Sequence, residues 1–152
     1  MNWNEYFFNI AHTVSTKSKD PSTKVGAVIV GPHHEIRSTG YNDLPRGMDD
    51  SNPKYRERPL KYDVTVHAER NAIYNAARVG VPTDECVLYL GHSPFMGICS
   101  GCAQAIIQAG ITHVVGPNIP FPGKGEDWKR DCRIADGMLR ESGVVLNEVT
   151  IQ

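Results

Sequence analysis

VHAERNAI occupies residues 66–73, and the rest of the chain is arranged around this stretch. It places His67 and Glu69 two residues apart, at the start of a predicted helix over residues 67–78. Alanines along this segment favour a helix that packs closely, and Gly80 is suited to end it. An imidazole and a carboxylate therefore lie together at one helix amino terminus.

A second motif, Cys99-Ser100-Gly101-Cys102, opens another predicted helix over residues 100–108. One turn can present both sulfurs to a single ion, and the partial positive charge at a helix amino terminus favours thiolate over thiol. Together with His67 the two cysteines make three protein ligands, the number found in catalytic zinc sites, which keep one position for water. The ion lowers the pKa of that water to about 7. Glu69, beside the open position, is the candidate proton carrier.

Each of these residues has a simpler interpretation when taken alone. A Cys-x-x-Cys motif also occurs in redox pairs and in halves of structural zinc sites, and His67 alone would more often be a satisfied polar residue. Glu69 alone would be a carboxylate that favours a helix start. The combination, with a strand between the two helices, favours the catalytic interpretation. The remaining thiols, Cys86 and Cys132, lie in apolar patterns and are predicted to be buried structural cysteines.

The rest of the pattern predicts a single α/β domain over residues 1–152. An amphipathic first helix ends near Lys17, and a hairpin of two strands follows. Later strands are predicted over residues 86–90, over residues 112–115 and from residue 144, with helices between them; the last helix contains Trp128 and Leu139. The order predicts a mixed sheet with helices on both faces, in which the hairpin supplies the antiparallel edge and right-handed crossovers supply the parallel pairs.

Composition excludes several classes of protein. The chain is 40% hydrophobic and 22% charged, as in ordinary globular domains, and its net charge of −1 gives no overall basic field to attract nucleic acid. No apolar run approaches the roughly 20 residues that cross a bilayer, and the amino terminus does not resemble a signal peptide. We therefore expect a cytoplasmic protein with reduced cysteines and no membrane partner, and the net charge disfavours a nucleic-acid partner.

Residues 43–63 show no periodicity and carry many charges. Loops of this length are usually functional or disordered. The segment is either a solvated flap or a flap that contributes phosphate contacts, and both interpretations stay open. Its cations are Arg46, Lys54, Arg56, Arg58 and Lys61.

Taken together, the motifs resemble the deoxycytidylate (dCMP) deaminases of the cytidine deaminase superfamily, over nearly the whole chain. His-x-Glu with Cys-x-x-Cys is shared by the superfamily of zinc-dependent base deaminases. Two further elements point to the dCMP branch, namely Ser18-Lys19-Asp20-Pro21 before the first strand and Gly40-Tyr41-Asn42 after the hairpin. The resemblance implies a three-layer αβα, cytidine-deaminase-like fold with a five-stranded mixed sheet. It also implies a zinc-dependent nucleotide deaminase that supplies dUMP for thymidylate synthesis.

The implied reaction converts dCMP, and also 5-substituted dCMP, to the uracil nucleotide. A water activated by Zn2+ adds to C4 of the pyrimidine, and Glu69 passes its proton to N3 and then helps to protonate the departing amine. Asn42 matches the asparagine that holds the substrate nucleoside, although it also suits an ordinary turn after a strand. The backbone N–H of Ala68 would face the pyrimidine carbonyl.

Two departures from the family pattern concern specificity. Ile98 stands where a proline usually precedes the first cysteine, and Pro94 lies upstream in a longer loop. Residues 116–128 lack the family's usual tyrosine-bearing loop; we expect Phe121 to stack on the base and Trp128 to pack in the core. These changes leave open a 5-substituted cytosine, a triphosphate or another nucleobase as substrate.

The resemblance also implies regulation and assembly. Many dCMP deaminases are activated by dCTP and inhibited by dTTP at a site that includes the turn after Gly-Tyr-Asn. Here Pro45 and Gly47 keep that pattern, whereas Asp43 replaces a glycine. Mg2+ would accompany a nucleoside triphosphate effector, and the family often forms homo-oligomers, including hexamers. The candidate phosphate or effector contacts are Lys19, Lys24, Arg46 and Gly47.

Two other functions fit the same residues. One is a deaminase of dCTP, guanine, another free base or tRNA adenosine, which would keep the zinc chemistry. The other is a non-catalytic nucleotide-binding or zinc-stabilised protein. Glu69 argues against the second, because a purely structural zinc site needs no proton carrier.

Overall fold

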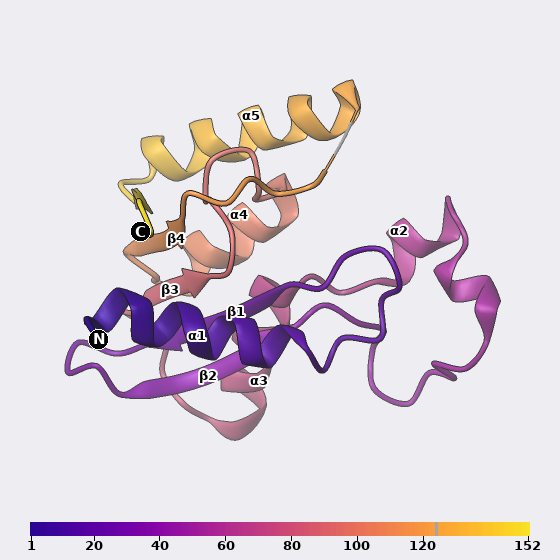
Figure 1. The fold of residues 1–152 in the computed structure, drawn as a ribbon, viewed down its shortest axis with the longest axis horizontal. Coiled ribbons are helices and arrows are strands. Elements are labelled where there is room, and N and C mark those ends of the chain that lie inside the picture. Colours follow the sequence, from indigo (N-terminus) through magenta and orange to yellow (C-terminus); the bar gives the residue numbers. More distant parts are fainter. Residues whose placement is uncertain (124) are drawn as a thin grey trace.

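The computed structural model describes residues 1–123 and 125–152, so Lys124 in the predicted loop 116–125 lies outside the described residues. The chain forms a central sheet with helices on both faces (Figure 1). The strands are β1 (Gly26–Val30), β2 (Ile36–Tyr41), β3 (Val87–Leu90), β4 (His113–Pro117) and β5 (Val145–Val149). The helices are α1 (Trp3–Ser15), η1 (Pro53–Arg56, a 3-10 turn), α2 (Leu60–Val64), α3 (Ala68–Val79), α4 (Ser100–Gln108) and α5 (Glu126–Glu141).

The sheet has five strands in the order β2-β1-β3-β4-β5. Strand β1 is antiparallel to both β2 and β3, whereas β3, β4 and β5 run parallel. The predicted mixed sheet is therefore confirmed, with the hairpin at the antiparallel edge. Every residue of β1 is buried, as expected for a strand covered on both faces.

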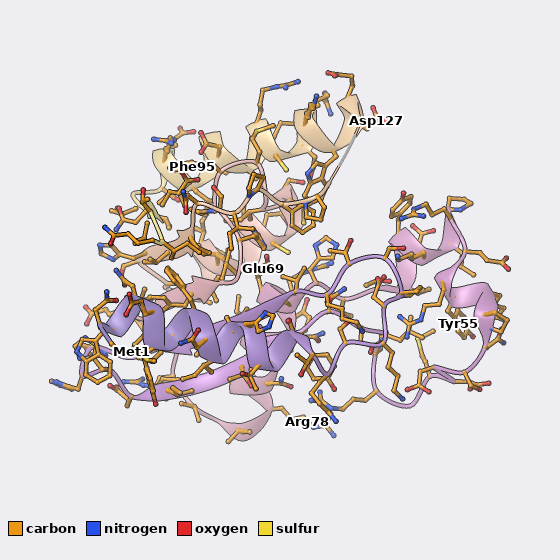
Figure 2. The ribbon with its side chains drawn as sticks, viewed as in Figure 1. Met1, Tyr55, Glu69, Arg78, Phe95 and Asp127 are labelled. Atoms are coloured by element: carbon orange, nitrogen blue, oxygen red, sulfur yellow. The ribbon has the colours of Figure 1, made fainter. Side chains whose placement is uncertain are left out.

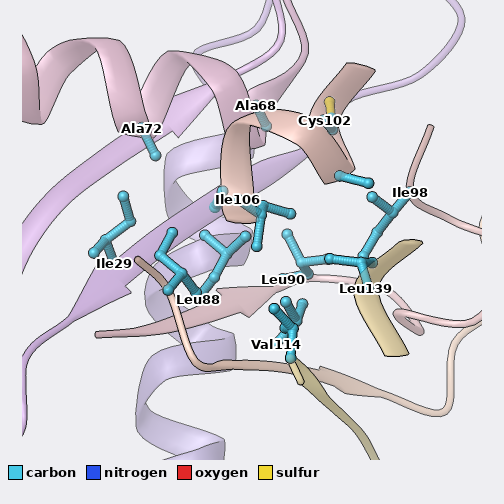
Figure 3. Close-up of a cluster of buried hydrophobic side chains, with 14 of the residues drawn as sticks. Ile29, Ala68, Ala72, Leu88, Leu90, Ile98, Cys102, Ile106, Val114 and Leu139 are labelled. Atoms are coloured by element: carbon cyan, nitrogen blue, oxygen red, sulfur yellow. The ribbon is translucent and has the colours of Figure 1, made fainter. Parts of the chain in front are cut away.

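Two cores lie on opposite faces of the sheet. On one face α1 packs Phe7 and Ala11 against alternate residues of β1, such as Val28. On the other face α3, α4 and α5 cover the intervening residues of the strands, including Ile29 and Leu88 (Figure 3). These two layers and the sheet between them form the three-layer αβα arrangement.

Close helix packing on the sheet depends on two glycines. A Cβ at Gly26 would lie 1.9 Å from the carbonyl oxygen of Ala11 in α1. A Cβ at Gly40 would lie 2.3 Å from the backbone nitrogen of Ala72 in α3. Small residues on both sides therefore allow α3 to lie against β2, which fixes where its amino terminus, with His67, emerges.

The segment of residues 43–63 contains two short helical elements that the sequence pattern did not predict, η1 and α2. Helices of one turn are too short to show a 3.6-residue hydrophobic repeat. This flap extends from one end of the sheet, at the right in Figure 1.

Two predictions about buried residues have different outcomes. Cys86 and Cys132 are 0% and 2% exposed and are free thiols, as predicted. The prediction that Trp128 packs in the core is wrong, because this side chain is only partly buried and lies over a loop. Among the described residues no helix is long and apolar enough to cross a membrane.

Candidate metal centre and active site

Two helix caps hold the candidate ligands. His67 is the N-cap residue of α3 and Cys99 is the N-cap residue of α4, both in extended backbone conformation. The Cys99 sulfur accepts a hydrogen bond from the backbone N–H of Cys102 at 3.4 Å. Because both caps lie on the same face of the sheet, the two motifs meet although a strand separates them in sequence.

The ligand atoms lie at distances that suit one metal ion. His67 Nδ1 is 3.3 Å from the sulfur of Cys99 and 3.4 Å from the sulfur of Cys102, and the three atoms lie within 4.8 Å of one another. Tetrahedral zinc with ordinary bond lengths separates nitrogen and sulfur ligands by about 3.5 Å. The donor set, two sulfurs and one imidazole, therefore fits Zn2+ in both chemistry and spacing.

The electrostatics of the cluster favour one thiolate. A hydrogen bond from the thiol of Cys102 and, after the opposing effect of burial, the contact with His67 lower the pKa of Cys99 to about 4. The same hydrogen bond, together with burial, raises the pKa of Cys102 well above its ordinary value. Burial opposes charge on His67, but its hydrogen bond with Cys99 raises the pKa of the imidazole. The two cysteines thus offer one anionic sulfur, that of Cys99, to which a cation can bind.

Glu69 lies in the first turn of α3 and is 3% exposed. Figure 2 places it near the middle of the molecule. One carboxylate oxygen, Oε2, accepts from the sulfur of Cys102 at 3.5 Å, and the other, Oε1, lies 3.9 Å from Nε2 of His92. A carboxylate that is shielded from water and borders the metal ligands on one side can carry a proton to a bound molecule.

The loops around the cluster are joined by aromatic contacts. The ring of His92 meets Phe121 edge-on at 4.9 Å, and Phe121 stacks on Trp128 at 5.1 Å. The indole N–H of Trp128 donates to the carbonyl oxygen of Met96 at 3.2 Å. Phe121 therefore contacts His92, which in turn lies beside Glu69. Trp128 is hydrogen-bonded to the neighbouring loop and does not enter the core. Ile98, which stands where the family has proline, is buried in the main core.

Asn42 is 7% exposed and uses its side chain on the backbone. Its Oδ1 accepts from the N–H of Val25 at 2.7 Å, and its Nδ2 donates to the carbonyl of Thr23 at 2.8 Å. These bonds tie the end of β2 to the segment before β1. Ala68 is the first residue of α3, so its N–H is one of those that lack an intrahelical acceptor.

The candidate phosphate contacts have partners within the chain. Lys19 pairs with Asp50 at 2.5 Å, and Lys24 donates to the carbonyl of Ser18. Arg46 donates to the side chain of Asn75 on α3 at 2.8 Å, and Gly47 adopts a positive φ of 92°. A cavity of about 270 Å³ lies beside several of the residues above; it is lined in part by Thr23, Lys24, Val25, His92 and Phe121.

Two flap cations are not solvated. Arg56 pairs with Asp43 at 2.8 Å, with both side chains at most 14% exposed. Lys61 pairs with Asp20 at 2.9 Å, with side chains 8% and 2% exposed. For these two cations both sequence interpretations fail, because neither is a solvated charge and neither is free to meet a phosphate.

Sequence reasoning missed two residues that border the cluster. His92 received no role, and Asp131 of α5 accepts hydrogen bonds from the backbone N–H and the hydroxyl of Ser100 at 2.8 and 2.7 Å. Asp131 thus holds the first residue of the helix that presents both sulfurs. Neither residue belongs to a local motif, so no sequence spacing could have identified it.

Comparison with known proteins identifies the family to which this chain is similar. A family described as the cytidine and deoxycytidylate deaminase zinc-binding region matches residues 1–116. An uncharacterised deaminase of Aliivibrio fischeri is 39% identical over 146 residues, which cover 93% of this chain and 90% of that protein. The deoxycytidylate deaminase of Homo sapiens is 39% identical over 120 residues, which cover 76% of this chain and 64% of that protein.

A solved structure extends the likeness to almost the entire fold. The dCMP deaminase of cyanophage S-TIM5, crystallised in complex with dCMP and dUMP, matches with a TM-score of 0.69 at 25% sequence identity. The match covers 97% of this chain and 95% of the phage chain. By contrast, the chain spans only 64% of the length of the human relative.

Proposed function

This chain belongs to the cytidine and deoxycytidylate deaminase family, and from that premise we propose that it catalyses the hydrolytic deamination of dCMP to dUMP. The observation that carries the proposal is the meeting of His67, Cys99 and Cys102 beside the buried carboxylate of Glu69. Further support comes from deoxycytidylate deaminases among its relatives and from the phage structure that binds dCMP and dUMP.

His67, Cys99 and Cys102 would hold the zinc ion of this family. Bound there, zinc supplies a Lewis acid and lowers the pKa of a water molecule to about 7. Glu69 would take a proton from the attacking water and deliver it to N3 of the pyrimidine as the water oxygen bonds to C4. A second proton transfer through Glu69 lets the C4 amine leave as ammonia, so that one water is consumed and a uracil ring remains.

The burial of Glu69 has a mechanistic reason. A carboxylate that is 3% exposed exchanges its proton with the bound substrate more readily than with bulk water. Its place in the first turn of α3 also keeps it two residues from His67, so that the proton carrier and a metal ligand move as one unit. The attacking water and the carboxylate would then meet neighbouring atoms of the pyrimidine ring.

Asn42, Ala68 and Phe121 are proposed to bind the nucleotide. An asparagine side chain offers two donor hydrogens and two acceptor lone pairs, and Asn42 spends one of each on the backbone. One donor and one acceptor stay available for a nucleoside hydroxyl. The N–H of Ala68 would meet the pyrimidine carbonyl, and Phe121 would contact the face of the base.

Regulation and assembly are proposed on the resemblance. Binding of dCTP or dTTP with Mg2+ near Lys19, Lys24, Arg46 and Gly47 would require the effector to displace intramolecular partners of these side chains. A homo-oligomer, such as a hexamer, is also proposed. The single domain over residues 1–152 and the cytoplasmic location stay predictions.

Substrate profiling tests the proposed function. Ammonia release from the zinc-loaded protein is measured with dCMP, 5-methyl-dCMP, dCTP, deoxycytidine, cytosine, guanine and adenosine-containing RNA side by side. We expect turnover of dCMP and its 5-substituted form alone. Equal turnover of deoxycytidine would contradict a nucleotide substrate, and turnover of guanine or RNA would assign the same chemistry to another base.

A variant of Glu69 tests the proton carrier. Glu69→Gln should retain zinc and thermal stability but lose about 10²- to 10⁴-fold in kcat, the usual contribution of a positioned acid or base. Glu126→Gln is the matched control, because Glu126 also lies in the first turn of a helix but its side chain is 83% exposed. Full activity of Glu69→Gln would exclude the proton-carrier role.

A further inference from the structure

His92 is a buried histidine beside the proposed proton carrier, and the proposed mechanism gives it no role. It follows β3 by two residues and is 5% exposed. Its ring is walled by Phe121, which meets it edge-on at 4.9 Å. A buried polar side chain normally has its hydrogen-bonding atoms satisfied, so each ring nitrogen needs a partner.

One ring nitrogen fixes the tautomer. Nδ1 of His92 lies 2.8 Å from the carbonyl oxygen of Ser93. A carbonyl oxygen can only accept, so Nδ1 carries the hydrogen. Burial lowers the pKa of His92, which favours the neutral ring. Nε2 is consequently an acceptor with a free lone pair.

The other ring nitrogen has no partner among residues 1–123 and 125–152. Nε2 of His92 is buried, and the polar atom facing it is Oε1 of Glu69 at 3.9 Å. Two acceptors at this distance do not bond to each other. A hydrogen-bond donor brought to this position by a bound molecule would satisfy Nε2, and burying it without such a donor costs free energy.

We propose that His92 is a specificity-determining residue that accepts a hydrogen bond from the exocyclic 4-amino group of the cytosine base. The inference rests on the proposed function. The amino group is the one donor on the Watson–Crick edge of cytosine, because N3 and O2 accept. Glu69 must reach both N3 and the departing amine, so the amine comes close to Glu69, and Nε2 of His92 lies 3.9 Å from Oε1 of the same carboxylate.

The reaction reverses this interaction. Deamination replaces the 4-amino donor by a carbonyl oxygen, which is an acceptor. His92 Nε2 would then face another acceptor, and the product would lose the hydrogen bond that the substrate makes. His92 therefore distinguishes substrate from product as well as one base from another.

A sugar hydroxyl is the rival donor, and it gives a different result. Both dCMP and dUMP carry the same deoxyribose, so an acceptor for its hydroxyl would bind both nucleotides equally. An acceptor for the 4-amino group affects dCMP alone. Comparing kcat/KM for dCMP with the inhibition constant of dUMP separates the two donors.

Two substitutions of His92 separate the donor role of Nδ1 from the acceptor role of Nε2. In His92→Asn the side-chain amide can still donate to the carbonyl of Ser93, in the place of Nδ1, but the inward acceptor is lost. In His92→Gln the longer side chain brings an amide oxygen to the position of Nε2. His113→Asn is the control, because His113 lies on β4 and bonds to Thr112 at 2.9 Å.

We expect kcat/KM for dCMP to fall about tenfold in His92→Asn, as for the loss of one net hydrogen bond, while the inhibition constant of dUMP changes by less than about twofold. His92→Gln should recover most of the loss, and His113→Asn should resemble the wild type. Zinc content and thermal unfolding are measured for every variant. If His92→Asn does not fold, His92→Gln and His92→Met give the same comparison, since only glutamine supplies an inward oxygen.

Equal weakening of dCMP and dUMP in His92→Asn would overturn the inference and point to a sugar contact or a packing effect. Unchanged kinetics would overturn it as well. Absence of dCMP turnover in the wild type would refute the proposed function, and the inference with it. Wild-type turnover with kinetically silent His92 variants would refute the inference alone.

Discussion

Asp131→Ala should weaken both folding and zinc binding, although Asp131 contacts none of the three proposed ligands through an observed hydrogen bond. Its carboxylate accepts two hydrogen bonds from Ser100, at 2.8 and 2.7 Å, at the first residue of α4. Charged hydrogen bonds contribute about 1.5–3 kcal/mol each, and an anion at a helix amino terminus adds roughly 0.3–1 kcal/mol. Because Asp131 is only partly buried, solvent reduces the sum to about 2–4 kcal/mol.

Part of this loss should appear in metal affinity. Cys99 precedes Ser100 directly, and Cys102 lies two residues beyond it, so loosening Ser100 disorders both sulfurs. Groups that orient metal ligands typically change affinity by about 10- to 100-fold. We therefore expect zinc to transfer to a competing chelator at least about tenfold more readily in Asp131→Ala.

The assay compares urea unfolding of the zinc-loaded proteins with zinc transfer to the chelator. Asp136→Ala is the matched control, since Asp136 lies on the same helix and pairs with Arg140 at 2.8 Å, with side chains 35% and 59% exposed. A surface pair of this kind contributes about 0.5 kcal/mol or less. If Asp131→Ala and Asp136→Ala release zinc equally, the carboxylate of Asp131 does not hold the start of α4 in place for metal binding, and the reasoning is refuted.

Two further substitutions test other parts of the structure. Lys61→Met should lower the free energy of unfolding by about 3–5 kcal/mol, because it leaves Asp20 buried and unpaired. Lys19→Met, at an exposed pair, should leave the free energy of unfolding nearly unchanged. Burial of Asp20 opposes its ionisation, but the hydrogen bond from Lys61 lowers the pKa of Asp20 below its ordinary 3.8. The wild type therefore keeps the stabilisation from this ion pair above pH 3.8 and loses it as the pH falls through the lowered pKa. Urea unfolding at pH 7 and pH 3 measures the difference in free energy of unfolding between the wild type and Lys61→Met. A difference that is as large at pH 3 as at pH 7 would contradict this prediction. Cys99→Ala should lose bound zinc in elemental analysis and Cys132→Ala should keep it; equal zinc in both would remove Cys99 from the ligand set.

The helix starts could be predicted because their signals are local. The predicted helix over residues 100–108 has the bounds of α4, Ser100–Gln108. The predicted helix over residues 67–78 lies within one residue of α3, Ala68–Val79, with His67 as its N-cap. A helix cap is decided by a few neighbouring residues, so the sequence displays it directly. The two caps come together because consecutive strands and helices of an αβα fold have few ways to pack.

The partners of isolated charges could not be predicted in the same way. Asp20 and Lys61 are 41 residues apart and meet inside the protein, and Asp131 meets Ser100 across 31 residues. A sequence pattern does not reveal such a pair, because each charged side chain is equally compatible with an exposed position on the surface. His92 was missed for a related reason, since it bonds only to a neighbouring carbonyl and lies beside a carboxylate from another element.

These long-range bonds give a structural reason for the motifs that carried the resemblance. The hydroxyl of Ser18 donates to the carbonyl of Asn42 at 2.6 Å, and the backbone N–H of Lys19 donates to Asp43 at 3.1 Å. Asn42 in turn binds the backbone at Val25. Ser-Lys-Asp-Pro and Gly-Tyr-Asn, which lie far apart in sequence, therefore form one hydrogen-bonded unit.

That unit also links the flap to the candidate active site. Asp20 accepts hydrogen bonds from Lys61 of α2 at 2.9 Å and from the backbone N–H groups of Ser22 and Thr23 at 2.8 and 3.2 Å. Thr23 is held by Asn42 and lines the cavity beside His92. A movement of the flap would pull on the wall of this cavity through buried, charge-assisted bonds. The motif residues therefore act first as a scaffold that positions the cavity, and a nucleotide contact by Asn42 would use the hydrogen-bonding capacity that this scaffold leaves free.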